Sequence, residues 1–405
     1  MNILFICDEY PPGKNGGVGT VVQVLAHELA RQGHKVFVAG LYAHSYGQKD
    51  YEEDQGVKVW RFRYGINLHV PHGHVLHKVF NRIPQSIKQH LNGKKAFHIF
   101  TEFIHSLIDN QQIDIIEAPD WNTFAMRIGF TVHWPAFKAP MVVKLHGSYT
   151  YLANEMHTPA KPWLTAVDRA LYERADALCA VSAYTAGKCK TLFQIKKNIR
   201  VLYNGIEAMP ESSITKESNT VIFTGTLIPL KGIFQLMKAW NLVNKHLPSA
   251  QLLIFGKGKT APLKELLNAG ASGTVHFKGH VPRQELFNQL ASATVAVFPS
   301  YTETFGMGPV EAMGAGCPVI FTKRASGPEI ISDKINGELI DPDNIEEISA
   351  SIIRILSRPD LQKQYSEKGK ETVLEKFNIS TSAQHHIAYY TEVIRHYTNT
   401  STITQ

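Results

Sequence analysis

The sequence contains no uninterrupted apolar run of about 18 residues, so no membrane-spanning helix is expected. Cysteine is scarce: the chain has four, with no C-x-x-C spacing and no histidines at metal-ligand intervals. Two of them lie in strand-like apolar segments, which predicts small buried side chains in a reducing compartment. The N-terminus lacks a basic region ahead of its short apolar stretch, unlike a secretory signal. A cytoplasmic protein is therefore expected.

Acidic residues are missing from positions 55–101, where eight lysines and arginines and six of the 19 histidines lie. Over the whole chain, charged residues make up 19% and hydrophobic residues 44%, which is typical of a globular rather than a disordered protein. At 405 residues the chain is too long for one ordinary core. It fits two domains of about 200 residues each.

Strand-like and helix-like segments alternate along the chain. Residues 2–7 and 35–40 are short apolar strands, and residues 18–34 repeat apolar side chains at helical spacing. A polar segment without aliphatic periodicity, residues 206–220, interrupts the pattern before it resumes. We therefore predict an α/β fold with two doubly wound, Rossmann-like domains and parallel sheets. The last eight residues, TNTSTITQ, are predicted to be disordered.

In open α/β sheets, ligands bind outside the carboxyl ends of the strands, so the loops there are the candidates. The first of them, DEYPPGKNGGVGT, carries Gly16, Gly17 and Gly19 just before a helix. Glycine permits close approach of a ligand, and free amides at a helix start attract anions. The loop does not match the dinucleotide pattern G-x-G-x-x-G. It fits an anion site and a tight turn without function equally well.

Two loops of the second half carry charge. In FTGTLIPLKGI, Lys231 lies where a strand-end loop becomes a helix, a position that suits either a phosphate partner or a solvated lysine. In SYTETFGMGPVEAMGAGCP, Pro309 suits the first helical position, which places Glu311 third in the helix and leaves Glu303 in the loop before it. The amides between the two carboxylates belong to Phe305, Gly306, Met307 and Gly308. Amides for phosphate and carboxylates for hydroxyls suit a sugar nucleotide, although Glu311 also suits an ordinary helix cap.

These segments together resemble glycosyltransferase family 4, retaining enzymes that use nucleotide sugars and have the GT-B fold. The resemblance covers nearly the whole chain. Its strongest signature is a glutamate, seven residues, a second glutamate and then AMGAGCPVI, and four further segments follow the family's order: PPGKNGGVG, FTGTLIPLKG, GHVPRQEL and NGELIDP. The resemblance implies two Rossmann-like domains with parallel sheets facing a central cleft.

The resemblance also implies a domain organisation. Residues 1–205 would form the acceptor-side domain and residues 221–380 the donor-side domain, joined by the linker 206–220. Residues 381–405 would form a C-terminal helix that packs back towards the N-terminal domain, followed by the disordered tail.

Carried over position by position, the resemblance assigns the donor site. Glu303, with the amides of residues 305–308, would bind the donor sugar and diphosphate, and Glu311 would bind the ribose hydroxyls. Lys231 would neutralise the departing diphosphate.

Further positions complete the expected site. Gly16 and Gly17 would approach the phosphate from the N-terminal domain. His146, in KLHGS, would lie near the transferred sugar, although a histidine at a strand end is otherwise more often a structural hydrogen bonder. The backbone around Gly279 to Val281 would contact the base.

One expected donor-binding position departs from the family pattern. Thr226 stands where the family usually has an arginine, and a hydroxyl does not replace the charge of a guanidinium. Either Lys231 and the helix start suffice for the diphosphate, or another cation such as Lys323 or Arg324 substitutes.

The expected reaction is a front-face substitution at the sugar carbon, in which preorganised charge meets the departing diphosphate. No cofactor or metal is expected, and there is no Asp-x-Asp motif. Three alternatives remain: a catalytically silent sugar-nucleotide-binding protein, a nucleotide-sugar epimerase and a phosphorylase of the same architecture.

The expected partners are a nucleotide-sugar donor and an acceptor hydroxyl, with no nucleic acid. Family members that act on lipid-linked acceptors touch the membrane through basic and aromatic residues. The region from Trp60 to Lys95, which includes Arg61, Phe62 and Arg63, is the candidate here for a peripheral contact at the inner membrane face. It also suits an anionic acceptor or an ordinary solvated helix face.

Overall fold

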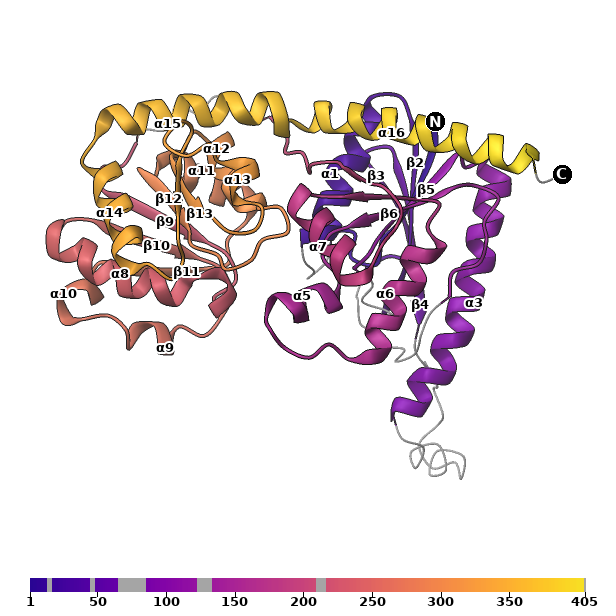
Figure 1. The fold of residues 1–405 in the computed structure, drawn as a ribbon, viewed down its shortest axis with the longest axis horizontal. Coiled ribbons are helices and arrows are strands. Elements are labelled where there is room, and N and C mark those ends of the chain that lie inside the picture. Colours follow the sequence, from indigo (N-terminus) through magenta and orange to yellow (C-terminus); the bar gives the residue numbers. More distant parts are fainter. Residues whose placement is uncertain (13–16, 44–47, 65–84, 122–132, 209–215, 404–405) are drawn as a thin grey trace. The chain divides into compact units, whose positions relative to one another are not determined.

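The computed structural model describes residues 1–12, 17–43, 48–64, 85–121, 133–208 and 216–403 (Figure 1). The chain divides into two compact units, each with its own sheet. The first unit contains Met1–Val181, Ala186–Leu202 and Ala383–Gln405, and the second contains Ser182–Thr185 and Tyr203–Ser382.

The first unit is built on an eight-stranded sheet with strand order β3-β4-β2-β1-β5-β6-β7-β8. All neighbouring strands are parallel except β3, which forms an antiparallel pair with β4 at one edge. The central strands β1, β5 and β6 are buried almost throughout, as expected when helices cover both faces of a sheet. The strands are β1 (Asn2–Ile6), β2 (Lys35–Ala43), β3 (Tyr51–Asp54), β4 (Val57–Tyr64), β5 (Ile115–Pro119), β6 (Met141–Leu145), β7 (Ala177–Ala180) and β8 (Ile199–Val201).

The helices of the first half follow from apolar spacing. In α1 (Gly17–Arg31), Val21, Leu25 and Leu29 recur every four residues and are buried, and Gly33 after its end has a φ of 89°. The other helices among the described residues of this half are α3 (Gln85–Gln111), α5 (Tyr149–Glu155), α6 (Pro162–Arg174) and α7 (Ala183–Phe193).

The second unit has a six-stranded sheet in which every pair is parallel, with strand order β11-β10-β9-β12-β13-β14. The strand order reverses direction between β9 and β12, and ligands bind at such switch points in doubly wound sheets. The strands are β9 (Thr220–Thr224), β10 (Gln251–Phe255), β11 (Val275–Gly279), β12 (Val295–Phe298), β13 (Val319–Thr322) and β14 (Glu338–Ile340).

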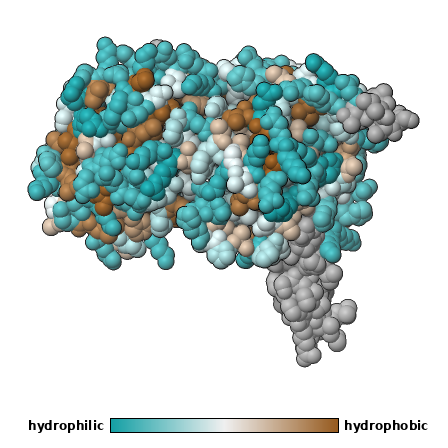
Figure 2. Space-filling view, viewed as in Figure 1, coloured by the Kyte–Doolittle hydropathy of each residue, from teal (hydrophilic) through white to brown (hydrophobic). Residues whose placement is uncertain are grey.

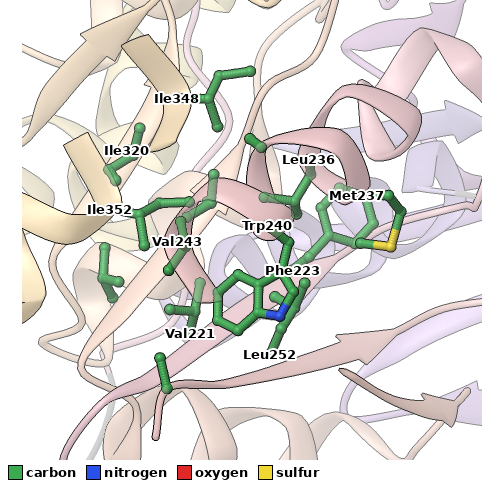
Figure 3. Packing of buried hydrophobic residues seen from close by; sticks show 14 of the residues in the cluster. Val221, Phe223, Leu236, Met237, Trp240, Val243, Leu252, Ile320, Ile348 and Ile352 are labelled. Atoms are coloured by element: carbon green, nitrogen blue, oxygen red, sulfur yellow. The ribbon is translucent and has the colours of Figure 1, made fainter. Parts of the chain in front are cut away.

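The core of the second unit gathers around Trp240 of α8, which is 0% exposed. Figure 3 shows this side chain among Val221 and Phe223 of β9 and Leu252 of β10. The helices are the 3₁₀ turn η2 (Pro229–Lys231), α8 (Ile233–His246), α9 (Ala261–Lys264), α10 (Ala269–Ser272), α11 (Arg283–Ser292), α12 (Met307–Gly314), α13 (Gly327–Ile330), α14 (Ile345–Leu356), α15 (Pro359–Thr372) and the π-helical turn η3 (Val373–Phe377).

The last helix, α16 (Ile379–Ile403), corrects one expectation. The predicted disordered tail is instead largely helical, because its first residues continue an established helix and nucleation is the costly step. The hydroxyl of Thr398 also donates to the carbonyl of Ile394. From Ala383 onward this helix groups with the first unit. Tyr390 donates to Glu117 at 2.6 Å and Lys144 to His386 at 2.9 Å, both among buried residues.

Two arginines proposed for membrane contact are held within the first unit. Arg61 is 2% exposed, and its guanidinium donates to the Pro11 carbonyl and pairs with Glu52. Arg63 pairs with Asp50 at 2.6 Å. The prediction is wrong for Arg61, which is buried and bound by an acid from outside the acid-free stretch. For Arg63 it stays a prediction.

The rest of the basic stretch is only partly described, since residues 65–84 lie outside the described residues. Phe62 packs on Phe100 and Phe103 of α3, and Trp60 also contacts Phe103. None of the described helices combines the length and apolarity needed to cross a bilayer. On the face drawn in Figure 2, hydrophilic residues predominate and hydrophobic residues lie in small groups between them.

Candidate functional site

The two residues with the strongest predicted roles meet in the second unit. Lys231 ends η2 after β9, and Glu303 lies in the loop after β12, which is the neighbour of β9. The Lys231 ammonium donates to Glu303 Oε1 at 2.7 Å, and Ser300 Oγ donates to the same oxygen at 2.9 Å. The two side chains are 31% and 14% exposed. A solvent-accessible cation is therefore held in place by a largely buried carboxylate.

The backbone around this pair approaches closely and needs glycine. Gly232 has a φ of 68°, and a Cβ atom there would lie 1.7 Å from the carbonyl oxygen of Pro299. A side chain at this position would push the Lys231 turn away from the end of β12. The close packing against Pro299 is enough to require glycine at position 232, whether or not a ligand binds there. The absence of a side chain at Gly232 lets the two strand-end loops approach each other.

The helix after Glu303 begins two residues earlier than expected. Its N-cap is Gly306, with a φ of 108°, so Met307 takes the first position and Pro309 the third. The prediction that Pro309 starts the helix is wrong. Proline is tolerated here because no amide of the first turn has an intrahelical acceptor. The amides of Met307 and Gly308 lie at the positive end of α12, while the Phe305 side chain is buried at 2% exposure.

Glu311 lies further along α12 and has a cationic neighbour from α11. The Arg283 guanidinium is 3.6 Å from Glu311 Oε1 and 3.5 Å from Glu207 Oε2. Burial raises the pKa of Glu311, and Arg283 opposes that rise. Arg283 was not among the predicted site residues, and GHVPRQEL suggested only the neighbouring base-contacting backbone.

Replacing Arg283 by alanine is expected to move the pH dependence of ligand binding. A Glu311 that binds hydroxyls as a carboxylate loses affinity as the pH falls through its pKa, and without Arg283 that pKa rises further. In R283A, nucleotide affinity should therefore fall at a higher pH than in the wild type. Calorimetric titration between about pH 5 and pH 8 measures this. The control is R358A, an exposed arginine paired with Asp360; identical profiles for R283A and the wild type would contradict the assignment.

His146 belongs to the first unit, directly after β6. Its backbone N–H donates to Asp120 Oδ1 at 2.7 Å, and the next amide, of Gly147, donates to Oδ2 at 3.3 Å. Burial, with a smaller contribution from Lys144, lowers the pKa of His146 well below its usual value, so the ring is neutral. Asp120 thus fixes the loop that carries His146.

Two buried aspartates that bind the loop carrying His146 have raised pKa values. Burial raises the pKa of Asp120 to about 7 and that of Asp168 to about 6. Asp168 accepts from Ser148, the N-cap residue of α5, at 2.8 Å. Asp120 is absent from the predicted site, although the sequence carries a signal for it, since an aspartate directly follows the β5 strand.

The remaining predicted positions are less constrained. Gly16 lies outside the described residues. Gly17 is exposed at the first residue of α1, and a Cβ atom there would meet nothing within 4 Å. Gly279 ends β11 with a φ of 73° and similarly open space, and Val281 follows at intermediate exposure. Thr226 is exposed in the loop after β9.

The cations suggested as substitutes at the Thr226 position already have partners. Lys323 lies 3.2 Å from Asp341, and Arg324 lies 2.7 Å from Asp341 and 2.6 Å from Asp343. These ion pairs argue against recruitment of either side chain.

Two family models match the chain in succession. The model described as Glycosyltransferase Family 4 matches residues 15–208, and the one described as Glycosyl transferases group 1 matches residues 206–372. The chain belongs to the GT4-type glycosyltransferases. An uncharacterised glycosyltransferase of Methanocaldococcus jannaschii is 24% identical over 409 residues, covering 96% of this chain and 98% of the relative.

Solved structures place this glycosyltransferase in the GT-B fold. Sucrose-phosphate synthase from Thermosynechococcus elongatus superposes with a TM-score of 0.73 at 19% identity, covering 97% of this chain and 99% of that one. The Anabaena protein HepE, solved in complex with UDP-glucose, gives a TM-score of 0.65 at 18% identity, covering 97% and 100%. The predicted family and fold are thereby confirmed.

Proposed function

We propose that this glycosyltransferase is a retaining enzyme that moves a hexose-type sugar from a nucleoside-diphosphate sugar to an acceptor hydroxyl. The observation that carries the proposal is the ion pair of Lys231 and Glu303 beside the start of α12. The Lys231 ammonium and the amides at the start of α12 suit a diphosphate, and the Glu303 carboxylate suits sugar hydroxyls. The UDP-glucose complex of HepE supports a nucleotide-sugar donor.

In the proposed mechanism, the bond between the sugar and the diphosphate loosens and the acceptor hydroxyl enters on the same face. Negative charge grows on the departing diphosphate. Lys231 and the N-terminal amides of α12 stabilise that charge, and because they are already oriented they need little reorganisation. The diphosphate takes the acceptor proton, and Glu303 and Glu311 hold hydroxyls of the donor.

His146 and the acceptor complete the proposal from the first unit. The neutral imidazole of His146, on a loop whose backbone is held by Asp120, can exchange a hydrogen bond with the transferred sugar without adding charge. The acceptor is a glycan, a small molecule or a lipid-linked hydroxyl. Exposed Lys94, Lys95 and Ile99 on α3 support a peripheral membrane contact for the lipid-linked case.

A nucleotide panel tests the proposal. One of UDP, GDP, ADP and dTDP is expected to raise the melting temperature, because a ligand at 100 times its Kd stabilises the folded state by about 2.7 kcal/mol. The matching sugar nucleotide should then release its diphosphate in the presence of an acceptor and give a product with the donor's anomeric configuration.

Other outcomes separate the alternatives. Stabilisation without release of the diphosphate would indicate a silent binding protein, and conversion of the donor without any acceptor would indicate an epimerase. If none of the four nucleotides raises the melting temperature, the proposed function fails.

A further inference from the structure

The loop that carries Glu303 is held by residues far from it in the sequence. Ser326 Oγ donates to the Phe305 carbonyl at 2.6 Å and to the Glu303 carbonyl at 3.2 Å. The carbonyl between them, of Thr304, accepts from Ser182 Oγ and, at 2.9 Å, from Thr185 Oγ1. Three successive carbonyls of this loop are therefore bound by hydroxyl groups.

Ser182–Thr185 precedes the second unit in the sequence but groups with it. The segment includes the start of α7, and two amides there donate to one carboxylate: Ala183 N to Glu329 Oε2 at 2.7 Å, and Tyr184 N to Glu329 Oε1 at 2.8 Å. Glu329 lies on α13, so α13 supplies the acid at the start of α7. Both amides would otherwise lack intrahelical acceptors, and the helix dipole favours a negative charge at this end.

The same carboxylate also holds an aromatic residue that packs on the loop. Tyr203 donates its hydroxyl to Glu329 Oε2 at 3.1 Å. The centroid of its ring lies 5.9 Å from that of Phe305, and the centroids of both rings lie 5.5 Å from that of Phe377. The charge of Glu329 is met by two amides and a phenol.

We propose that Glu329 is a positioning residue of the donor site. It fixes Ser182–Thr185 and Tyr203, and these two elements contact the two residues that follow Glu303: the first binds the Thr304 carbonyl and the second packs on the Phe305 ring. The expected effect on ligand binding rests on the proposed function, in which Glu303 and the start of α12 bind the nucleotide sugar. Glu329 itself does not touch the substrate.

Glu329→Gln tests the first step without any ligand. The glutamine side chain has one acceptor oxygen, and its NH₂ group cannot accept a hydrogen bond. It can therefore accept from the backbone N–H of Ala183 or of Tyr184, but not from both. Hydrogen exchange of the Val310 amide, which donates to the carbonyl of Gly306 at the end of the loop that carries Glu303, should quicken by about tenfold. Glu329→Asp keeps the carboxylate and should restore part of the protection, and Tyr203→Phe removes one donor and should have a smaller effect. The matched control is Glu346→Gln, an exposed first-turn acid of α14 in the same unit.

Nucleotide affinity tests the second step. With the nucleotide that best stabilises the wild type, E329Q should bind about tenfold more weakly, E329D should be intermediate and E346Q unchanged. Unchanged exchange of the Val310 amide in E329Q and E329D would overturn the inference, and so would equal nucleotide affinity of E329Q and the wild type. A wild type that binds none of the nucleotides would instead overturn the proposed function, and this is seen before any variant is compared.

Discussion

Replacing Lys231 by alanine is expected to lower kcat by about 100- to 1,000-fold, the usual cost of removing one preorganised group that meets developing charge. The Lys231 ammonium lies 2.7 Å from Glu303 and is partly open to solvent, so it can meet a second anion without leaving its partner. Its loss removes the cation and leaves Glu303 as an unpaired carboxylate beside a diphosphate. Initial rates of diphosphate release with a saturating donor measure the effect.

The control for this experiment is Lys238→Ala. Lys238 is an exposed lysine on α8, the helix that directly follows Lys231 in the chain. Its removal should leave kcat within about twofold, because surface charges away from a site contribute little. A K231A enzyme that is as active as K238A would exclude Lys231 from charge stabilisation and would shift attention to the amides of α12.

Trp240→Ala is expected to destabilise the second unit by about 3–5 kcal/mol, the range for truncating a fully buried large aromatic side chain. Trp240 is 0% exposed and packs against the strands in Figure 3. Its indole N–H also donates to Thr274 at 2.9 Å, so truncation leaves that hydroxyl with fewer partners. Urea unfolding, with hydrogen exchange of β9 and β10 reporting on this unit, measures the change.

Trp163→Ala provides the matched comparison. Trp163 lies at the start of α6 in the first unit at intermediate exposure. Its truncation therefore removes less buried apolar surface and leaves no enclosed cavity. Its replacement should cost clearly less, and should leave exchange in β9 and β10 unchanged. A loss below about 1 kcal/mol in W240A would mean that the core relaxes into the space, contrary to the dense packing assigned here.

Much of the fold could be predicted because parallel sheets covered on both faces require nearly continuous apolar strands. Segments such as 141–145 and 295–298 are buried at every position, and their sequences have the apolar character of a central strand. The antiparallel strand β3 was missed because its sequence, YEED, is acidic and edge strands tolerate such residues. Its register against β4 pairs Glu53 with Lys58, which no local pattern reveals.

The site was predicted in its composition but not in its detail. The spacing of Glu303 and Glu311 placed one acid in a loop and the other on a helix, as the structure has them. The predicted start of that helix was two residues too late. Whether Gly306 or the residue before Pro309 is the N-cap depends on the backbone angle at Gly306, which the sequence does not show. Arg61 was misassigned for a related reason: a count of charge along the chain does not include an acid that approaches across a hairpin, as Glu52 does.

The sequence alone therefore determined the family, the alternation of strands and helices, and the residue types at the site, because these depend on local spacing and side-chain chemistry. Only the tertiary structure decided which of these groups meet. Lys231 and Glu303 are 72 positions apart, and Ala183 and Glu329 are 146 apart. Contacts at such separations are set by the strand order and by the approach of two loops, as at Gly232. No periodicity along the chain encodes them.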